Sequence, residues 1–504
     1  MEWAKSATHE VVDTLKEGAE YLVDTVPVRR VSETAETAYE TAAGTAGSAY
    51  ETAAQTAGSA YETATEYLPE AGKGGSLTAS VLNTRPFSSL KPDPGNVWKA
   101  YLVYVLLSMA CTLPWWTFVV AVDYFSYLYP NSHIMRLFPL FYFGPWLVVY
   151  VLFSVYGRQF TAWGRINLGC MIALVSLITV PVIDRLFIKG EHGTTGTLWV
   201  TLVAVALAGA GDSIAQGSLL GIAAELPERL THAYVVGASV SGVTMFVIRV
   251  ITKEAFSYTP TGLRISSIVY FSIAPAIIIL VLSIFAYIHY RPEIGYYDSL
   301  GLGSIETVRL LLQDEVTVTI EVAASVGIAA VAAGRKSPAQ PIDYGPVLSR
   351  AKFLAVAVTV TSLVSLFIFP GFLTEDLQSK QMGDWYQVLI VGTYIISDLL
   401  GRIVTKQFAM DRHSSLFGTA WARVVIIIFF VLALFLRGPG KLPMLFLLTA
   451  ILGATNGYLI GSLTLLMPRS NPPDQAEPAG IILATLMTVG SLVGAALSWL
   501  LVLA

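Results

Sequence analysis

Eleven apolar stretches follow one another between residue 97 and the end of this 504-residue chain. The hydrocarbon core of a bilayer is about 30 Å thick, and about 20 helical residues cross it. In lipid only helices and closed barrels satisfy their backbone hydrogen bonds, and barrel strands are much shorter than these stretches. The sequence therefore predicts an all-α polytopic membrane protein with helices at 97–125, 134–156, 161–188, 197–224, 230–256, 265–289, 349–372, 385–408, 415–436, 442–467 and 477–503.

The composition agrees with a membrane protein, since 54% of the residues are hydrophobic and 13% are charged. Soluble domains usually carry about 25% charged residues. The formal net charge of −4 gives no reason to expect a nucleic-acid partner. Cys111 and Cys170 both fall inside predicted helices, so we expect free buried thiols rather than a disulfide. There is no HExxH and no P-loop motif, so we expect no cofactor, no metal and no enzymatic activity.

Residues 1–96 are predicted to form a separate cytoplasmic tail. An 11-residue repeat begins at Tyr39, Tyr50 and Tyr61, and this period matches three helical turns. Its glycines weaken an isolated helix by up to about 1 kcal/mol each. We therefore expect a disordered or conditionally helical tail, either inert or a module that binds a partner or a lipid surface.

The longest polar interruption, at 291–346, is predicted to be a cytoplasmic loop that separates a six-helix half at 97–290 from a five-helix half at 347–504. Inside this loop Val316–Ala333 is apolar but short and contains Glu321, which favours a packed or interfacial helix over a twelfth span. Lysine and arginine near the helix ends favour a cytoplasmic N-terminus. We expect a multi-pass protein of the plasma membrane rather than of a vacuolar or other internal membrane.

The segment 385–408 carries two ionisable residues in its middle. Asp398 and Arg402 are four residues apart, so they share one helix face and can reach each other. An ionisable group near the membrane centre costs about 2.5–3.5 kcal/mol on insertion scales, so such residues face a bundle interior or a wet cavity. The pair is either a structural ion pair between helices or part of a functional site.

Other polar and aromatic residues also fall within the predicted helices. Trp115 and Trp116 follow Pro114 and lie too deep for an interfacial belt, so they either pack between helices or line a cavity that accepts a flat heterocycle. Gln216 offers a donor and an acceptor, either to a polar ligand or to another helix. The secondary polar candidates are Asp123, which solvation near a helix end would explain, Asp212, four residues before Gln216, Arg249 and Asn456.

Four passages resemble those of the equilibrative nucleoside transporters, and the resemblance extends in order over 97–504. The passages are LPWWTFVVAVDYFSYLYP in the first span, GDSIAQGSLLGIAAELPE in the fourth, SDLLGR in the eighth, and GATNGYLIGSLTLLMP with the following AEPAG in the last two. The wording of AVDYFSYLYP and of ELPERLTHAYVVGASVSGV is most similar to that of the plant and algal branch.

The resemblance implies a major-facilitator-like fold of six plus five helices with alternating access between the halves. By the family motif, Trp115 would border the nucleobase, Gln216 would hydrogen-bond it, and Asp398 and Arg402 would hold the ribose hydroxyls or each other. The family usually has asparagine where this chain has Trp116 and, often, where it has Ile395. Two lost polar groups leave open a preference for nucleobases or another substrate.

The sequence thus favours a transporter of nucleosides, with nucleobases as an open alternative. Its transport is either passive or coupled to protons, with Asp123, Asp212 and Asp398 as the candidate proton carriers. The competing hypothesis is a receptor-like membrane protein that binds without transporting and uses its tail as an interaction module. We expect small-molecule ligands, protons and the lipid bilayer as partners; no protein partner is indicated.

Overall fold

The computed structural model describes residues 94–156, 162–188, 192–225, 228–256, 259–289, 344–377, 379, 381–408, 410, 412–435, 440–471 and 475–503. The tail repeats and the apolar stretch Val316–Ala333 lie outside these ranges. Within them, 11 helices are long and apolar enough to cross a membrane. The predicted all-α polytopic fold is confirmed, and no β-strand occurs in the part of the chain that the structure describes.

Six of the spanning helices precede the segment 290–343 and five follow it. The first set comprises α4 (Pro94–Val120), α6 (Ile134–Tyr156), α7 (Ala162–Ile183) continued by η3 (Asp184–Ile188), α8 (Thr195–Glu225), α9 (Glu228–Ala255) and α10 (Pro260–His289). The second set comprises α15 (Lys352–Ile368) with η5 (Phe372–Asp376), α16 (Trp385–Thr405), α17 (His413–Ala422) with α18 (Val424–Phe435), α19 (Lys441–Arg469) and α20 (Ala476–Leu497) with α21 (Leu500–Leu503). A short helix, α14 (Tyr344–Arg350), precedes α15.

The first predicted span, 97–125, is too long at its C-terminal end. Helix α4 ends at Val120, and a separate short helix, α5 (Val122–Leu128), begins after Ala121, whose ψ of 28° is outside the helical range. This break places Asp123 in α5 rather than in the first spanning helix, to which hydropathy assigns it.

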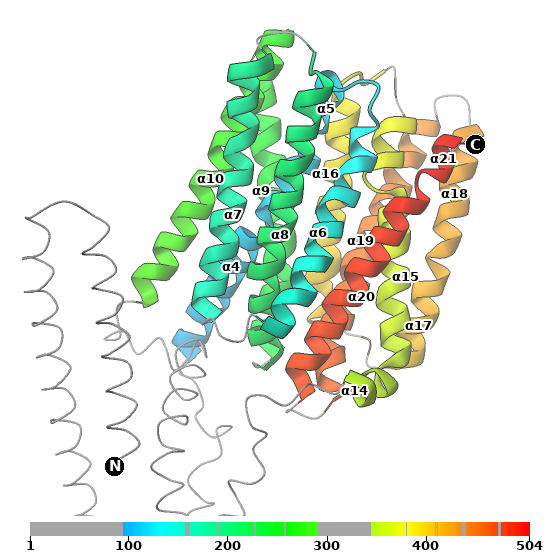
Figure 1. The fold of residues 1–504 in the computed structure, drawn as a ribbon. Helices are drawn as coiled ribbons and strands as arrows, with labels where there is room; N and C mark the ends of the chain where they lie inside the picture. The colour runs from blue at the N-terminus through cyan, green and yellow to red at the C-terminus, as the bar shows by residue number, and fades with distance from the viewer. Residues whose placement is uncertain are drawn as a thin grey trace, which may run out of the picture. The chain divides into compact units, whose positions relative to one another are not determined.

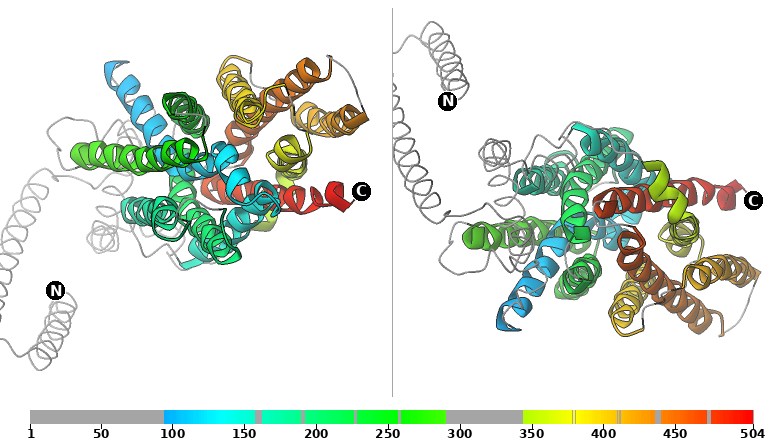
Figure 2. Two further views of the ribbon diagram at one scale, coloured as in Figure 1. Left: turned by 90° about the horizontal axis from the view of Figure 1, so that it is seen from above. Right: turned by 90° about the horizontal axis from the view of Figure 1, so that it is seen from below.

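The helices of each set gather on their own side of the bundle (Figures 1 and 2). The two sets pack against each other along α16 with α9 and along α20 with α6 and α8. Large apolar side chains remain exposed on the outside of nearly every spanning helix, where a bilayer would cover them; Phe187, Ile251, Leu280 and Phe429 are examples.

Glycines allow some of these helices to approach very closely. A Cβ atom added to Gly457 of α19 would overlap the backbone carbonyl oxygen of Asp398 on α16. Gly169 of α7 and Gly211 of α8 face each other in the same way. Helix association in membranes depends on such small residues because lipid tails are as apolar as the side chains.

Candidate functional site

Asp398, in the middle of α16, is the centre of a buried network of hydrogen bonds. Arg402 donates from Nε to Asp398 Oδ2 at 2.9 Å, as the spacing of four residues predicts. Ser239 of α9 donates to the same oxygen, and Asn456 of α19 donates from Nδ2 to Oδ1 at 2.7 Å. Three helices thus satisfy one carboxylate that is 1% exposed.

Arg402 also ties α16 to α9, which belongs to the other set of helices. Its Nη1 donates to the carbonyl of Val235 at 3.1 Å, and its own carbonyl lies 3.1 Å from His232 Nε2. His232, which the sequence places at a helix end, is therefore buried against α16. Arg402 Nη2 has no protein partner in the described part of the chain, so this nitrogen is free to meet a ligand.

The network continues from Asn456 to a wholly buried arginine on the loop between α17 and α18. Ser365 Oγ lies 2.7 Å from Asn456 Oδ1 and accepts a hydrogen bond from Arg423 Nη2 at 2.9 Å. Arg423 also donates to the carbonyl of Thr361 at 2.8 Å. Arg423 is not among the residues predicted from the sequence, although it is an ionisable residue inside the apolar stretch 415–436, just as Asp398 is inside 385–408.

Trp115 lies in a second cluster, beside aromatic rings of α6. Its ring centroid is 4.7 Å from that of Tyr142 and 5.0 Å from that of Phe143. The Tyr142 hydroxyl donates to Asp212 Oδ2 on α8 at 2.6 Å. Gln216 lies one helical turn after Asp212, is partly exposed, and has no hydrogen-bond partner among the described residues.

Helix α9 packs against α16 and also contacts α8. The structure thus brings Asp398, Arg402 and Asn456 together, and it links Trp115 to Asp212 through Tyr142. Aromatic rings and a free amide suit a flat heterocycle, and a carboxylate with a guanidinium suits hydroxyl groups.

The two apolar departures from the family motif lie against the same glycine. A Cβ added to Gly242 of α9 would lie 2.8 Å from Ile395 Cγ2 and 3.0 Å from Trp116 Cδ2. The Trp116 indole donates from Nε1 to the carbonyl of Ala238 at 3.2 Å, so it needs no other polar partner. One apolar contact between the two sets of helices therefore occupies the place of two polar side chains.

Asp123 and Arg249 belong to neither cluster. Asp123 is buried rather than solvated, and it accepts hydrogen bonds from Arg249 Nη2 at 2.8 Å and from Lys253 Nζ at 2.7 Å. Burial alone would raise the pKa of Asp123, but the charges and hydrogen bonds of Arg249 and Lys253 outweigh it and lower the pKa. A carboxylate that stays ionised at neutral pH is unsuited to carry a proton.

We expect the stability that this ion cluster contributes to be independent of pH near neutrality. Because the folded pKa is below the unfolded value of about 3.9, the contribution is complete above that pH and is lost as the pH falls through the folded pKa. The difference in melting temperature between the wild type and Asp123→Asn should be constant between about pH 5 and pH 8. Differential scanning fluorimetry of detergent-purified protein measures it, and a difference that shrinks between pH 8 and pH 6 would contradict this assignment.

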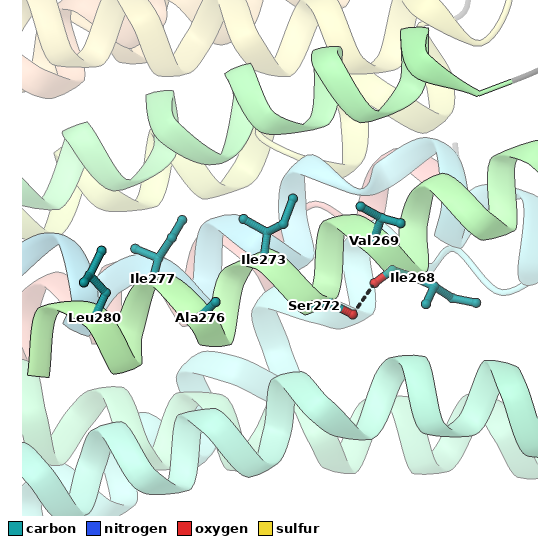
Figure 3. Close-up of a pocket in the computed structure, with 7 residues that line it drawn as sticks. All are labelled: Ile268, Val269, Ser272, Ile273, Ala276, Ile277 and Leu280. Carbon is teal, nitrogen blue, oxygen red and sulfur yellow. Dashed lines mark hydrogen bonds between the residues drawn. The ribbon is translucent and has the colours of Figure 1, made fainter. Parts of the chain in front are cut away.

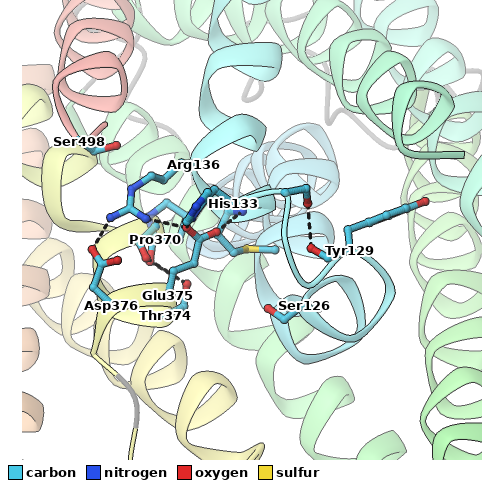
Figure 4. A network of polar contacts seen from close by, with 12 residues as sticks. Ser126, Tyr129, His133, Arg136, Pro370, Thr374, Glu375, Asp376 and Ser498 are labelled. Atoms are coloured by element: carbon cyan, nitrogen blue, oxygen red, sulfur yellow. Dashed lines mark hydrogen bonds and ion pairs between the residues drawn. The ribbon is translucent and has the colours of Figure 1, made fainter. Parts of the chain in front are cut away.

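At the end of the bundle where α6 begins, a buried clasp joins the two sets of helices (Figure 4). The Arg136 side chain is 0% exposed and forms ion pairs with Glu375, at 2.7 Å, and with Asp376. Glu375 also accepts from the Met135 backbone at 2.9 Å and lies 3.2 Å from His133 Nδ1. At the opposite end, Glu228 of α9 and Arg469 of α19 form an ion pair whose side chains are 45% and 46% exposed.

A hollow of about 410 Å³ lies on the surface of α10 (Figure 3). Its lining is apolar except for Ser272, whose hydroxyl donates to the backbone carbonyl of Ile268. The lining residues are Ile268, Val269, Ser272, Ile273, Ala276, Ile277 and Leu280, all on one helix. A hollow without converging polar groups is not a site for a polar ligand.

Comparison with known proteins gives consistent results. A family model described as "Nucleoside transporter" matches residues 202–503. Equilibrative nucleotide transporter 1 of Arabidopsis thaliana is 32% identical over 432 residues, which are 85% of this chain and 91% of the relative. Equilibrative nucleotide transporter 8 of the same plant is 29% identical over 406 residues, 80% of this chain and 94% of the relative.

Among solved structures, the major facilitator superfamily proton:xylose symporter XylE bound to 6-bromo-6-deoxy-D-glucose is similar in fold. Its TM-score is 0.52 at 11% identity, and the match covers 82% of this chain and 89% of that chain. A similarity at this identity concerns the fold alone, and it agrees with the predicted major-facilitator-like arrangement.

Proposed function

Since the chain belongs to the nucleoside transporter family and is a multi-pass membrane protein, we propose that it binds a nucleoside between its two sets of helices and moves it by alternating access. The observation that supports this most is the polar network around Asp398. It is buried at mid-helix, and it joins α9 of the first set to α16 and α19 of the second. Substrate sites of such transporters lie near the bilayer midplane between repeats.

Each proposed contact uses a group that the protein leaves available. The Gln216 amide and the partly exposed Trp115 ring would bind the base, by hydrogen bonds and by stacking. Asp398 and Arg402 would bind the ribose, and Arg402 Nη2 is the guanidinium nitrogen without a protein partner in the described chain. After the bonds from Arg402, Ser239 and Asn456, one lone pair of Asp398 remains, and it can accept from a ribose hydroxyl.

The charges of the interior favour a nucleoside over a nucleotide, although the relatives' names refer to nucleotides. A phosphate group needs cations that are not already neutralised. In the described interior, Arg402 is paired with Asp398, Arg249 and Lys253 with Asp123, and Arg264 with Asp184. Arg423 is wholly buried and its donors are taken by neutral acceptors. The Asp123 cluster, with two cations for one carboxylate, and Arg423 keep an excess of positive charge, but their donors are already hydrogen-bonded to protein groups, so a phosphate would have to displace those partners.

The two ends of the bundle differ in a way that suits alternating access. In the clasp the Arg136 side chain is fully buried and Glu375 and Asp376 are 13% and 24% exposed, whereas the Glu228–Arg469 pair is about half exposed. Exposed ion pairs contribute only about 0–1 kcal/mol, so this end opens at lower cost. A substrate that binds both states similarly permits the exchange between them without trapping either.

The side of the membrane on which each end lies is part of the proposal. Lysine and arginine are more frequent near the helix ends on the side of the N-terminus, which favours a cytoplasmic N-terminus. On this orientation the clasp faces away from the cytoplasm. We further propose the plasma membrane as the location.

Uptake of labelled uridine and adenosine into cells that lack their own carriers tests the function. Saturable uptake that unlabelled nucleosides inhibit, and that AMP does not, is the expected result. Inhibition by adenine alone would favour a nucleobase carrier, and inhibition by AMP at low concentration would contradict the charge argument. Binding without any uptake would favour a receptor-like protein.

We expect Gln216→Ala to raise the KM for uridine about 10-fold with intact surface expression. One hydrogen bond to a desolvated base is lost, which costs about 1–3 kcal/mol, and 1.4 kcal/mol corresponds to a factor of 10. Gln407→Ala is the matched control, because this glutamine is exposed after the end of α16. Equal KM values for the two variants would exclude Gln216 from the site.

A further inference from the structure

Asp212 is a buried carboxyl group without a countercharge. Its residue is 4% exposed, and its Oδ2 accepts hydrogen bonds from the Tyr142 hydroxyl at 2.6 Å and from Trp146 Nε1 at 3.3 Å. Its Oδ1 is buried without a hydrogen-bond partner, and no ion pair involves it within the described ranges. Both of its hydrogen-bond donors are neutral.

The other buried aspartates that the structure describes are different. Asp123, Asp184 and Asp398 each form an ion pair with an arginine at 2.7–2.9 Å. In each of the three, an arginine balances the charge of the carboxylate. An ionised carboxylate held only by neutral donors is costly in an apolar interior, and the group avoids that cost by taking up a proton.

The described titratable groups that face Asp212 from the neighbouring helices are tyrosines and cysteines. Helices α6 and α7 lie on either side of α8 (Figure 1), and α4, α9 and α20 complete its surroundings. Beyond Pro478, α20 contains no titratable side chain. The side chain of Tyr458 on α19 is directed elsewhere, to the carbonyl of Phe408. The facing titratable groups are Cys111 of α4, Tyr142 and Tyr150 of α6, Cys170 of α7 and Tyr234 of α9.

Asp212 is directly connected to the proposed base-binding groups. Tyr142 donates to its carboxylate and contacts the Trp115 ring at 4.7 Å between centroids. Gln216 follows one turn later on the same helix face. Protonation makes the carboxyl a donor and weakens its bond from the Tyr142 hydroxyl, because that bond is stronger to an ionised acceptor. The position of the tyrosine ring, and with it that of Trp115, then depends on the proton.

We propose that Asp212 is the proton-binding residue through which nucleoside movement is coupled to the movement of a proton. This proposal rests on the nucleoside transport proposed above and adds its ion dependence. The proton binds Asp212 when the site faces the acidic side, the protein changes conformation while the carboxyl is neutral and the nucleoside is bound, and the proton and the nucleoside leave on the other side. The Tyr142 hydroxyl and the Trp115 ring link the protonation state of Asp212 to the binding of the nucleobase.

The test uses the full-length protein in proteoliposomes, with labelled uridine and an inward proton gradient. Wild-type uptake is expected to fall several-fold when a protonophore is added. Asp212→Asn should remove this difference while it retains uridine exchange without a gradient, because asparagine imitates the neutral carboxyl group. Asp212→Glu, which keeps a titratable group, should restore the sensitivity. Asp384→Asn, an exposed aspartate, is the control that should behave as the wild type does.

The outcomes separate this proposal from the function on which it rests. Uridine exchange in the wild type without any effect of the protonophore would overturn the proton coupling and leave transport intact. An unchanged protonophore effect in Asp212→Asn would overturn the assignment to Asp212, as would loss of exchange in a variant that remains folded. A pH dye trapped in wild-type vesicles requires no variant: uridine should acidify the interior, and no acidification would overturn the proposal. Absence of both uptake and exchange in the wild type would contradict nucleoside transport itself.

Discussion

Asp398→Asn is expected to lower nucleoside uptake by about 100-fold or more. Removal of one partner from a buried ion pair costs about 3–5 kcal/mol, since it leaves an uncompensated charge, and each 1.4 kcal/mol is a factor of 10. The charge that remains belongs to Arg402, whose side chain is 14% exposed. Asparagine is nearly the same size as aspartate, so the loss of uptake measures the effect of removing the negative charge. Uptake at a uridine concentration below the KM, normalised to surface protein, measures it.

A second substitution separates the structural part of this effect from ligand binding. Asp398→Asn combined with Arg402→Gln removes both charges, and we expect it to recover much of the melting temperature but none of the uptake. Asp384→Asn, on an exposed aspartate just before α16, should change neither quantity. Full recovery of uptake in the double variant would show that the pair is structural only and would remove it from the site.

Gly457→Leu is expected to prevent correct assembly of the five-helix set. The new Cβ would overlap the Asp398 carbonyl oxygen, so α19 would have to move away from α16 and the bond from Asn456 to Asp398 would break. Leucine favours a helix over glycine by roughly 1 kcal/mol, so helix propensity alone predicts that the substitution stabilises α19. Size-exclusion chromatography of a fluorescent fusion should show loss of the monodisperse peak.

The control for this prediction is Gly418→Leu, because a Cβ at Gly418 of α17 meets nothing within 4 Å. We expect it to retain the peak and the melting temperature of the wild type. A monodisperse and active Gly457→Leu protein would mean that α16 and α19 do not pack as closely as described.

Hydropathy was sufficient to predict all eleven spans because each needs only a local run of apolar residues. The Asp398–Arg402 contact was predictable for the same reason, since a spacing of four residues fixes it within one helix. The break at Ala121 was not, because Val122 and the aromatic residues after Asp123 continue the apolar run. Hydropathy therefore extended the first span to residue 125.

Contacts between distant helices were beyond the reach of the sequence. Arg136 and Glu375 are 239 residues apart, and no local pattern indicates that they meet. The link from Arg423 through Ser365 to Asn456 depends on how three helices cross. In the sequence, Trp116 and Ile395 are two unrelated positions where an apolar residue replaces a polar one. The structure places both against Gly242, in one apolar contact.

The most direct test of the proposed site is a cryo-electron microscopy structure of the protein with bound adenosine. The account predicts density between α4, α8 and α16, with the base beside Trp115 and within hydrogen-bond distance of the Gln216 amide. The ribose should lie next to Asp398 and Arg402. Nucleoside density elsewhere, such as in the hollow on α10, with Gln216 and Asp398 unoccupied, would contradict the central claim.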